Sequence, residues 1–258
     1  MSDPTWSSKL AKQARWWLWA GALAAISTAF GQEPRDAGVQ DSGQTDALKP
    51  FARGFAKDVL QDQKAIWTSP FHVTRKNARW WLTFGAITGV ALATDGRTSR
   101  QLPNTADQRA YSRDVSQAGA AYTLIPIAGA LYVSGVLGNN PKLRGTGLLG
   151  GRALADALVV SEVLKAATGR QRPLEGDGAG RFFHGSDGFP SGHAMESFAL
   201  ASVIAHRYRT KKAVVIAAYG IATLISASRF SGQKHFASDI VAGGVMGWFI
   251  GRHVFETQ

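Results

Sequence analysis

Six apolar segments fill most of the chain after residue 80, and they restrict its fold more than any other feature. They span residues 80–94, 117–141, 145–167, 191–205, 213–228 and 240–251. None of them alternates apolar and polar residues as a half-buried strand does, and the chain contains no internal repeat. The sequence therefore predicts an all-α fold, a helical bundle of about six core helices.

Glycines at a spacing of four indicate how these helices pack. The last segment contains Gly243, Gly247 and Gly251, and the first contains Gly85 and Gly89. Small residues at this spacing let helix backbones approach closely, as in many membrane proteins. We therefore expect close helix contacts at these positions.

The bundle is expected to be embedded in a membrane. Residues 117–141 form the one stretch comfortably long enough to span a bilayer. The other segments are shorter and the mean hydropathy is only −0.08, so a soluble or peripheral bundle is the alternative. The basic loop 207–212 lies inside if the chain crosses six times from an inner N-terminus. That topology predicts an integral protein of the cell envelope whose opposite, outer (periplasmic) face carries the chemical motifs described below.

The first 79 residues divide into a signal-like part and a connecting part. Basic residues precede the apolar run 16–30, and small residues end it, so residues 1–31 resemble a cleaved signal peptide. An uncleaved anchor or an interfacial helix is the alternative. Residues 32–79 are interpreted as a polar linker up to Pro50 followed by an amphipathic helix over 51–67. If the run 16–30 crosses the membrane, the topology inverts, and the sequence leaves that conflict open.

The composition excludes some functions. The net charge is +11, from 29 Lys and Arg against 18 Asp and Glu, but the cations are scattered, so we do not expect nucleic-acid binding. The absence of cysteine excludes disulfides and thiolate chemistry. No cofactor, metal ion or obligate protein partner is indicated.

Three short motifs near the C-terminus supply groups that suit phosphate. The first motif has Lys165 and Arg172 seven residues apart, followed by Pro173. Two helical turns separate the two cations, so we expect both on one side of a helix that ends near Pro173. A point cation and a forked donor together match phosphoryl oxygens.

The second motif is the tetrapeptide that starts at Pro190 and continues with Ser191, Gly192 and His193. A serine and free backbone N–H groups at a helix start form an anion site, and the glycine permits close approach. His193, one turn into the helix, can exchange a proton near neutral pH.

The third motif contains Ser228, Arg229, His235 and Asp239. The histidine and the aspartate lie four residues apart, on one helix face. The carboxylate can accept a hydrogen bond from one imidazole nitrogen and leave the other as nucleophile or base. Each motif alone has an ordinary explanation, such as a basic helix end, an N-cap or an exposed ion pair.

Together the three motifs resemble the signature of the type 2 phosphatidic acid phosphatase superfamily, without a substitution or a change in spacing. The resemblance extends over roughly residues 80–253, and residues 80–258 are interpreted as the catalytic domain. It implies a metal-independent phosphatase that hydrolyses a phosphate monoester or pyrophosphate, expected to be lipid-linked. From its own composition, the Gly-rich loop 174–189 between the first two motifs is a candidate lid, with a plain flexible connector as the favoured alternative.

The resemblance also implies a role for each residue. His235 would attack phosphorus and form a phosphohistidine, Asp239 would orient it, and His193 would act as acid and base. The phosphoryl oxygens would be held by Lys165, Arg172, Ser191, Gly192 and Arg229.

Three alternatives differ in substrate or class. A soluble periplasmic acid phosphatase of the same superfamily would accept small esters. A vanadium haloperoxidase would hold vanadate in the same pocket, although those proteins are usually larger. A non-catalytic membrane scaffold would not need the complete set of motif residues.

Overall fold

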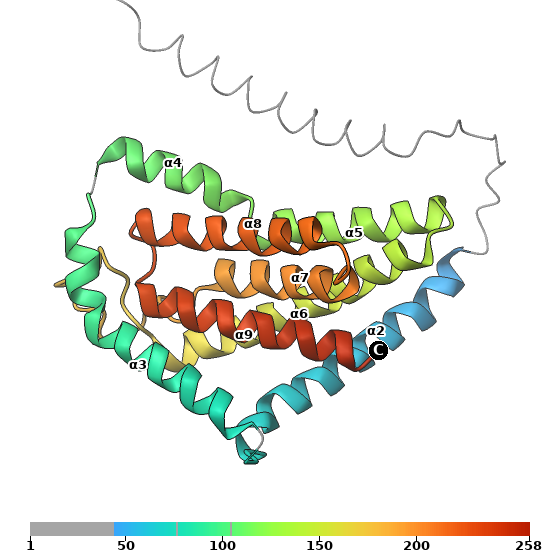
Figure 1. Cartoon of the computed structure of the whole chain (residues 1–258), viewed down its shortest axis with the longest axis horizontal. Coiled ribbons are helices and arrows are strands. Elements are labelled where there is room, and N and C mark those ends of the chain that lie inside the picture. The colour runs from blue at the N-terminus through green and yellow to red at the C-terminus, as the bar shows by residue number, and fades with distance from the viewer. Residues whose placement is uncertain (1–43, 76, 104) are drawn as a thin grey trace, which may run out of the picture. The chain divides into compact units, whose positions relative to one another are not determined.

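The structure, a computed structural model, describes residues 44–258 apart from 76 and 104, with side chains from residue 54 onward. The signal-like segment lies outside the described residues. Every regular element of the described part is helical, as Figure 1 shows, so the expected all-α class is confirmed. The elements are α2 (Gln44–Thr68), η1 (Ser69–Phe71), α3 (Ala78–Gln101), α4 (Ala106–Gln117), α5 (Ala121–Leu137), α6 (Pro141–Thr168), α7 (Gly192–Arg207), α8 (Lys212–Ser231) and α9 (Ala237–Glu256).

The six apolar segments correspond to α3 and α5–α9, and two expected boundaries differ in the structure. The segment expected from residue 117 begins its helix only at Ala121, after a turn that follows α4. The prediction of a polar linker up to Pro50 is wrong for residues 44–50, because these residues form the first turns of α2. Hydrophobic periodicity did not reveal these turns because the polar residues there carry little apolar signal.

Helix α4 was not expected because its sequence is strongly polar. Its start is capped by Thr105, whose hydroxyl oxygen accepts a hydrogen bond from the Gln108 amide. The Gln108 side chain donates to the Ser231 carbonyl at 2.7 Å, and Ser112 bonds with the Ser231 hydroxyl at 2.8 Å. Polar contacts with the end of α8 therefore hold α4, and a hydrophobic pattern cannot predict them.

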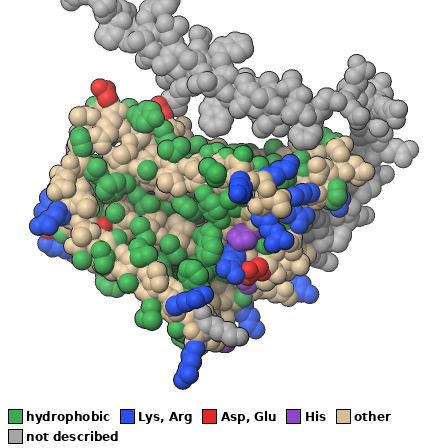
Figure 2. Space-filling model, viewed as in Figure 1, with side chains coloured by type: hydrophobic (Ala, Val, Ile, Leu, Met, Phe, Trp, Pro, Cys, Tyr) green, Lys and Arg blue, Asp and Glu red, His purple; other side chains and the backbone are tan. Residues whose placement is uncertain are grey.

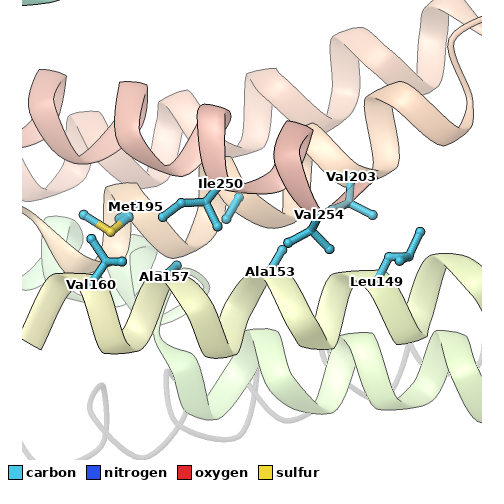
Figure 3. Close-up of a cluster of buried hydrophobic side chains, with 9 residues drawn as sticks. Leu149, Ala153, Ala157, Val160, Met195, Val203, Ile250 and Val254 are labelled. Atoms are coloured by element: carbon cyan, nitrogen blue, oxygen red, sulfur yellow. The ribbon is translucent and has the colours of Figure 1, made fainter. Parts of the chain in front are cut away.

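The main core lies between α6, α7 and α9. Figure 3 shows Leu149, Ala153 and Val160 of α6 facing Met195 of α7 and Val254 of α9. A second, smaller cluster joins α5, α6 and α7 through Leu124, Ala128, Leu154 and Leu200. Because burial of apolar surface is the main favourable term in folding, these clusters fix the relative positions of the helices that carry the three motifs.

Glycines of α9 bring it against the backbone of α7. A Cβ atom on Gly247 would lie 2.1 Å from the Met195 carbonyl oxygen, and one on Gly251 would lie 2.2 Å from that of Ala199. The predicted close contact is confirmed for α9. It is wrong for α3, where a Cβ on Gly85 or Gly89 would meet nothing within 4 Å.

The order of these contacts shows how the helices run. Gly243 meets Ser191 and Gly251 meets Ala199, so α7 and α9 are parallel. Helix α8 connects them and runs the opposite way. Helix α6 runs antiparallel to α7, since Gly150 near the start of α6 meets Leu200 and Lys165 near its end meets Gly192 at the start of α7. The C-terminal ends of α6 and α8 therefore lie at the same end of the bundle as the N-terminal ends of α7 and α9.

Polar pairs attach α2 to α6. The guanidinium of Arg152 donates to the buried carboxylate of Asp62 at 2.6 Å, and the Gln63 amide donates to the Asp156 carboxylate at 2.8 Å. Buried charges of this kind are tolerated when they are paired. This contact lies about nine residues or more from Lys165 along α6, away from the motifs.

Candidate active site

The three motifs meet at the end of the bundle just described. Lys165 lies in the last turn of α6, Ser191 caps the start of α7, and Arg229 lies in the last turn of α8. His235 lies in the short connection between α8 and α9, and Asp239 lies in the first turn of α9. Segments up to about seventy residues apart in the sequence are thus brought together by antiparallel helix packing.

The first motif is not continuous helix. Helix α6 ends at Thr168, and Gly169 follows it with φ +50°. This left-handed conformation favours glycine and ends the helix before Arg172. The expectation that Lys165 and Arg172 project from one helix is therefore wrong: Arg172 belongs to the loop that leads to α7.

Carboxylates pair with both cations of the first motif. Lys165 contacts Glu162 at 2.6 Å, and Arg172 donates two hydrogen bonds of 2.8 Å to the Asp187 carboxylate. Burial alone would raise the pKa of Asp187, but the hydrogen bond and charge of Arg172 outweigh it and lower that pKa. An anion that binds here must compete with Asp187 for Arg172.

A pocket of about 370 Å³ lies beside these groups. Its lining comes from the end of α6 and from the loop, and consists of Glu162, Lys165, Ala166, Gly185, Ser186 and Asp187. The candidate lid therefore contributes to the pocket wall through residues 185–187, whereas the side chain of His184 is exposed.

The second motif joins the first one at close range. A Cβ on Gly192 would lie 3.3 Å from the Lys165 ammonium nitrogen, so the lysine side chain lies tightly against the start of α7. The Ser191 hydroxyl is fully buried and has no hydrogen-bond partner among the described residues. Its backbone amide donates to the Asp239 carbonyl at 3.0 Å, which ties the second motif to the third.

His193 interacts electrostatically with residues of the first and third motifs, so charges from all three motifs meet at its imidazole. It is half-buried, and it interacts electrostatically with Arg229, His235, Lys165 and Arg172. The Arg229 guanidinium donates to the Ser116 hydroxyl of α4 at 3.2 Å, while its buried Nε has no partner in the described part of the chain. The structure therefore brings together all eight residues expected from the sequence.

Residue His235 is almost fully buried, and a backbone carbonyl sets its orientation. Its Nδ1 lies 2.8 Å from the Gly188 carbonyl oxygen, whereas the nearest Asp239 oxygen is 3.8 Å away. A carbonyl can only accept, so Nδ1 carries the proton and Nε2 keeps its lone pair. Burial lowers the pKa of His235, and the nearby Asp239 carboxylate opposes that effect without cancelling it.

Comparison with protein families identifies the region that carries the motifs. Residues 146–258 match the model of the PAP2 superfamily. Among solved structures, a transmembrane PAP2-type phosphatidylglycerolphosphate phosphatase from Bacillus subtilis is similar, with 21% sequence identity and a TM-score of 0.49. The similarity covers 79% of this chain and 94% of that one. A search of curated proteins gave no significant match.

One buried residue of the PAP2 region was missed by the sequence analysis. Arg170 is 2% exposed, and its Nη1 donates to the Asp239 carboxylate at 2.5 Å and to the Ser238 hydroxyl at 2.6 Å. The rings of Phe182 and Phe236 stack on its guanidinium, with distances of 4.8 and 4.6 Å from the Arg170 Cζ atom to the two ring centroids. Asp239, expected to orient His235, therefore has Arg170 as its direct charged partner.

A second missed residue lies outside the PAP2 match. Asp95 of α3 accepts a hydrogen bond from Arg170 Nη2 at 2.8 Å and one from the Ser238 amide at 3.1 Å. Asp95 is 1% exposed. Sequence spacing could not have revealed the pair of Asp95 and Arg170, because the two residues are 75 positions apart and neither is one of the motif residues.

Two further findings concern other ligands. Among the described residues, no cluster of three or more His, Cys, Asp or Glu could hold a metal ion. A larger, apolar pocket of about 600 Å³ lies between α7, α8 and α9, and contains none of the eight expected residues.

Proposed function

We propose that this chain is a phosphatase that hydrolyses a lipid-linked phosphate monoester or pyrophosphate through a phosphohistidine at His235. The match of residues 146–258 to the PAP2 superfamily model supports phosphatase activity in general. The observation that carries the finer proposal is the geometry of His235. Its Nδ1 is engaged by the Gly188 carbonyl and its Nε2 is unprotonated, which is the state required of a nucleophile.

In the first step, Nε2 of His235 attacks phosphorus, an N–P bond forms, and the bond from phosphorus to the ester oxygen breaks. Burial and the neighbouring cations lower the pKa of His193 to about 3, so His193 must first take up a proton as the phosphoryl anion binds and offsets those cations. It then donates this proton to the leaving oxygen, and the product departs as an alcohol or, from a pyrophosphate, as a phosphate. In the second step, His193 takes a proton from water, whose oxygen attacks phosphorus. The N–P bond breaks and inorganic phosphate leaves.

Cations and unpaired donors provide the binding site for the phosphoryl group. Lys165, Arg172 and Arg229 carry the positive charge that offsets the three phosphoryl oxygens. The buried Ser191 hydroxyl and the Arg229 Nε have no partner in the described chain, and a phosphoryl oxygen would satisfy each of them. The backbone N–H of Gly192 at the start of α7 adds a helix N-terminus to this set.

Exposed apolar side chains support a membrane-embedded site and hence a lipid substrate. Among the described residues, the stretches 106–137 (α4, the turn after it and α5) and 212–231 (α8) each contain an 18-residue window apolar enough to cross a membrane, and only 22% of each window is buried. A core helix of a soluble protein would be mostly buried. Large apolar side chains face outward on several helices, as the green areas of Figure 2 illustrate, including Leu82 and Val90 of α3, Val133 of α5, and Ile216 and Leu224 of α8.

Basic loops at the other end of the bundle support an outer, periplasmic site. The Lys142 ammonium lies 4.6 Å from the Tyr208 ring, so the α5–α6 and α7–α8 connections are neighbours. The second connection also carries Arg209, Lys211 and Lys212. Positive loops tend to stay on the cytoplasmic side, and this rule supports an outer position for the end with the motifs.

Phosphate release tests the function directly. Purified chain in detergent, with EDTA present, is expected to release inorganic phosphate from phosphatidic acid, and His235→Ala is expected to abolish the release. His184→Ala is the matched control, since His184 is exposed and lies outside the set of eight residues. Unchanged turnover by His235→Ala would contradict the mechanism. Hydrolysis of p-nitrophenyl phosphate alone would favour the soluble acid phosphatase alternative.

A further inference from the structure

We propose that Asp95 and Arg170 are positioning residues for His235, so that α3, outside the PAP2 match, belongs to the catalytic apparatus. This inference rests on the proposed function, because it assigns the pair to the step in which His235 attacks. Its structural part concerns how the imidazole is held, and that part can be tested without turnover.

Arg170 contacts both segments that flank His235. Its side chain binds Oδ1 of Asp239, whose Oδ2 accepts a hydrogen bond of 2.7 Å from the Phe236 amide, the next residue after His235. Its backbone carbonyl accepts a hydrogen bond of 2.8 Å from the Gly188 amide, and the carbonyl of Gly188 accepts from His235 Nδ1. One residue therefore anchors the backbone beside the imidazole and the acceptor that orients it.

Asp95 fixes the guanidinium of Arg170 in turn. Its carboxylate accepts from Arg170 Nη2 and from both the amide and the hydroxyl of Ser238. The Arg170 Nε donates to the Gly180 carbonyl at 3.0 Å. Every nitrogen of the guanidinium thus has an acceptor, and the Phe182 and Phe236 rings cover its faces.

The chemistry of this cluster requires both partners. A buried guanidinium that loses one of its two carboxylates is left with an incompletely compensated charge. In an Asp95→Asn variant the new NH₂ group would face a donor, either Arg170 Nη2 or a Ser238 group, so the fork would lose its geometry. Lysine could not replace Arg170, because one ammonium cannot reach acceptors in three directions in one plane.

Position explains why this cluster affects catalysis as well as stability. In-line attack requires Nε2 of His235 to lie on the axis of the breaking bond, and misplacement by about 1 Å can cost roughly 100-fold in rate. The hydrogen bonds and ion pairs of Asp95 and the Arg170 side chain in the described chain involve Ser238, Asp239 and Gly180, and none of the three phosphate-binding cations. We therefore expect a loss in kcat with little change in KM.

The test compares Asp95→Asn with Asp62→Asn. Asp62 forms an equivalent buried pair with Arg152, also from an N-terminal helix to the body of the domain, but it lies away from the motifs. Asp95→Asn is expected to lower kcat roughly 100-fold and leave KM within about twofold. Asp62→Asn is expected to lower the unfolding temperature and keep kcat. Equal losses of kcat in both variants, or none in Asp95→Asn, would overturn the assignment.

A spectroscopic measurement separates this inference from the proposed function. In ¹⁵N-histidine-labelled protein, with the His235 signal assigned by its loss in His235→Gln, the wild type is expected to show the Nδ1–H tautomer. Asp95→Asn and the milder Ser238→Ala are expected to show a tautomer mixture or exchange broadening, whereas Asp62→Asn retains the wild-type signal. If the wild type releases no phosphate but the tautomer still depends on Asp95, only the function is wrong. A His235 signal that is identical in all of the folded variants overturns the positioning role.

Discussion

At the scale of single residues, the site depends on backbone acceptors as much as on the side chains of the motifs. His235 donates to the Gly188 carbonyl, and a Cβ on Gly188 would lie 2.7 Å from the Arg170 carbonyl oxygen. Asp239 in turn caps the start of α9 by accepting from the Phe236 amide. Asp239 therefore acts on His235 mainly by fixing the neighbouring backbone and by supplying negative charge. The spacing of four residues alone could not distinguish this role from a direct hydrogen bond to the imidazole.

The protonation of His235 gives the first prediction. Burial lowers its pKa, so the imidazole should stay neutral as the pH falls below the ordinary value of about 6.5. The unfolded chain binds the proton first, so stability should fall with decreasing pH by up to about 1.4 kcal/mol per unit until His235 itself protonates. A ¹⁵N titration of the assigned His235 signal checks this. A midpoint at or above 6.5 would contradict it.

Competition for Arg172 gives a second prediction. Asp187→Asn removes the carboxylate that holds the Arg172 guanidinium, so inorganic phosphate should inhibit about two- to fivefold more strongly, a modest change because the pair is partly exposed. Asp177→Asn is the matched control, because Asp177 pairs with Arg181 in the same loop and contacts neither Lys165 nor Arg172. Inhibition constants for phosphate measure the effect. Weaker inhibition of Asp187→Asn would show that Asp187 supports the site instead of competing in it.

At the scale of the elements, the contact between α7 and α9 positions the second and third motifs relative to each other. Gly243 lies against the carbonyl of Ser191, the cap residue of α7, with a Cβ distance of 2.5 Å. The Ser191 amide also donates to the Asp239 carbonyl. The starts of the two parallel helices are thereby held together where the phosphoryl group is proposed to bind.

Glycine substitutions test this packing. Gly247→Ala would place a Cβ 2.1 Å from the Met195 carbonyl oxygen, and such overpacking should cost about 1–3 kcal/mol. Gly220→Ala in α8 meets nothing within 4 Å and should leave stability unchanged or raise it by up to about 1 kcal/mol through helix propensity. Thermal unfolding in detergent compares the two variants. An equal stability of the two would mean that α9 does not pack on α7 as described.

The comparison of sequence and structure is also clearest in the elements. The long apolar segments predicted α3 and α5–α9, because each of these helices carries many apolar side chains, some in the core and some on the outer surface. It missed α4, which is held by polar contacts with α8. Motif spacing predicted a set of candidate site residues that the structure brings to one end of the bundle, because reactive groups at fixed intervals imply a shared site. The ion pair of Arg170 and Asp95 could not be predicted, because a buried pair between distant residues leaves no local pattern in the sequence.

At the scale of the whole molecule, the end with the motifs and the end with the basic loops are opposite in the bundle. Lys165 and His235 lie at one end, and the α7–α8 connection with Lys211 lies at the other. In a membrane, the two ends would face different compartments. If the chain acts on phosphorylated lipids as proposed, its topology therefore determines which of them can reach the site.

The chain contains no cysteine, which allows a direct test of topology. We expect His184→Cys, in the loop beside the site, to react with a membrane-impermeant maleimide in cells whose outer face is accessible. Lys211→Cys should react only after lysis. Reactivity in the opposite order would place the site in the cytoplasm, as a membrane-crossing N-terminal segment would require. Reaction of both in a fraction released without detergent would indicate a soluble protein.

The most direct test of the central claim is the covalent intermediate itself. A rapid quench into alkali, with lipid substrate labelled with ³²P in its terminal phosphate, should trap the label on the wild-type chain. Peptide mapping is expected to place that label on His235 as an acid-labile phosphohistidine, and His235→Ala should carry none. Label on His193, or full turnover by a chain that never carries label, would contradict the account.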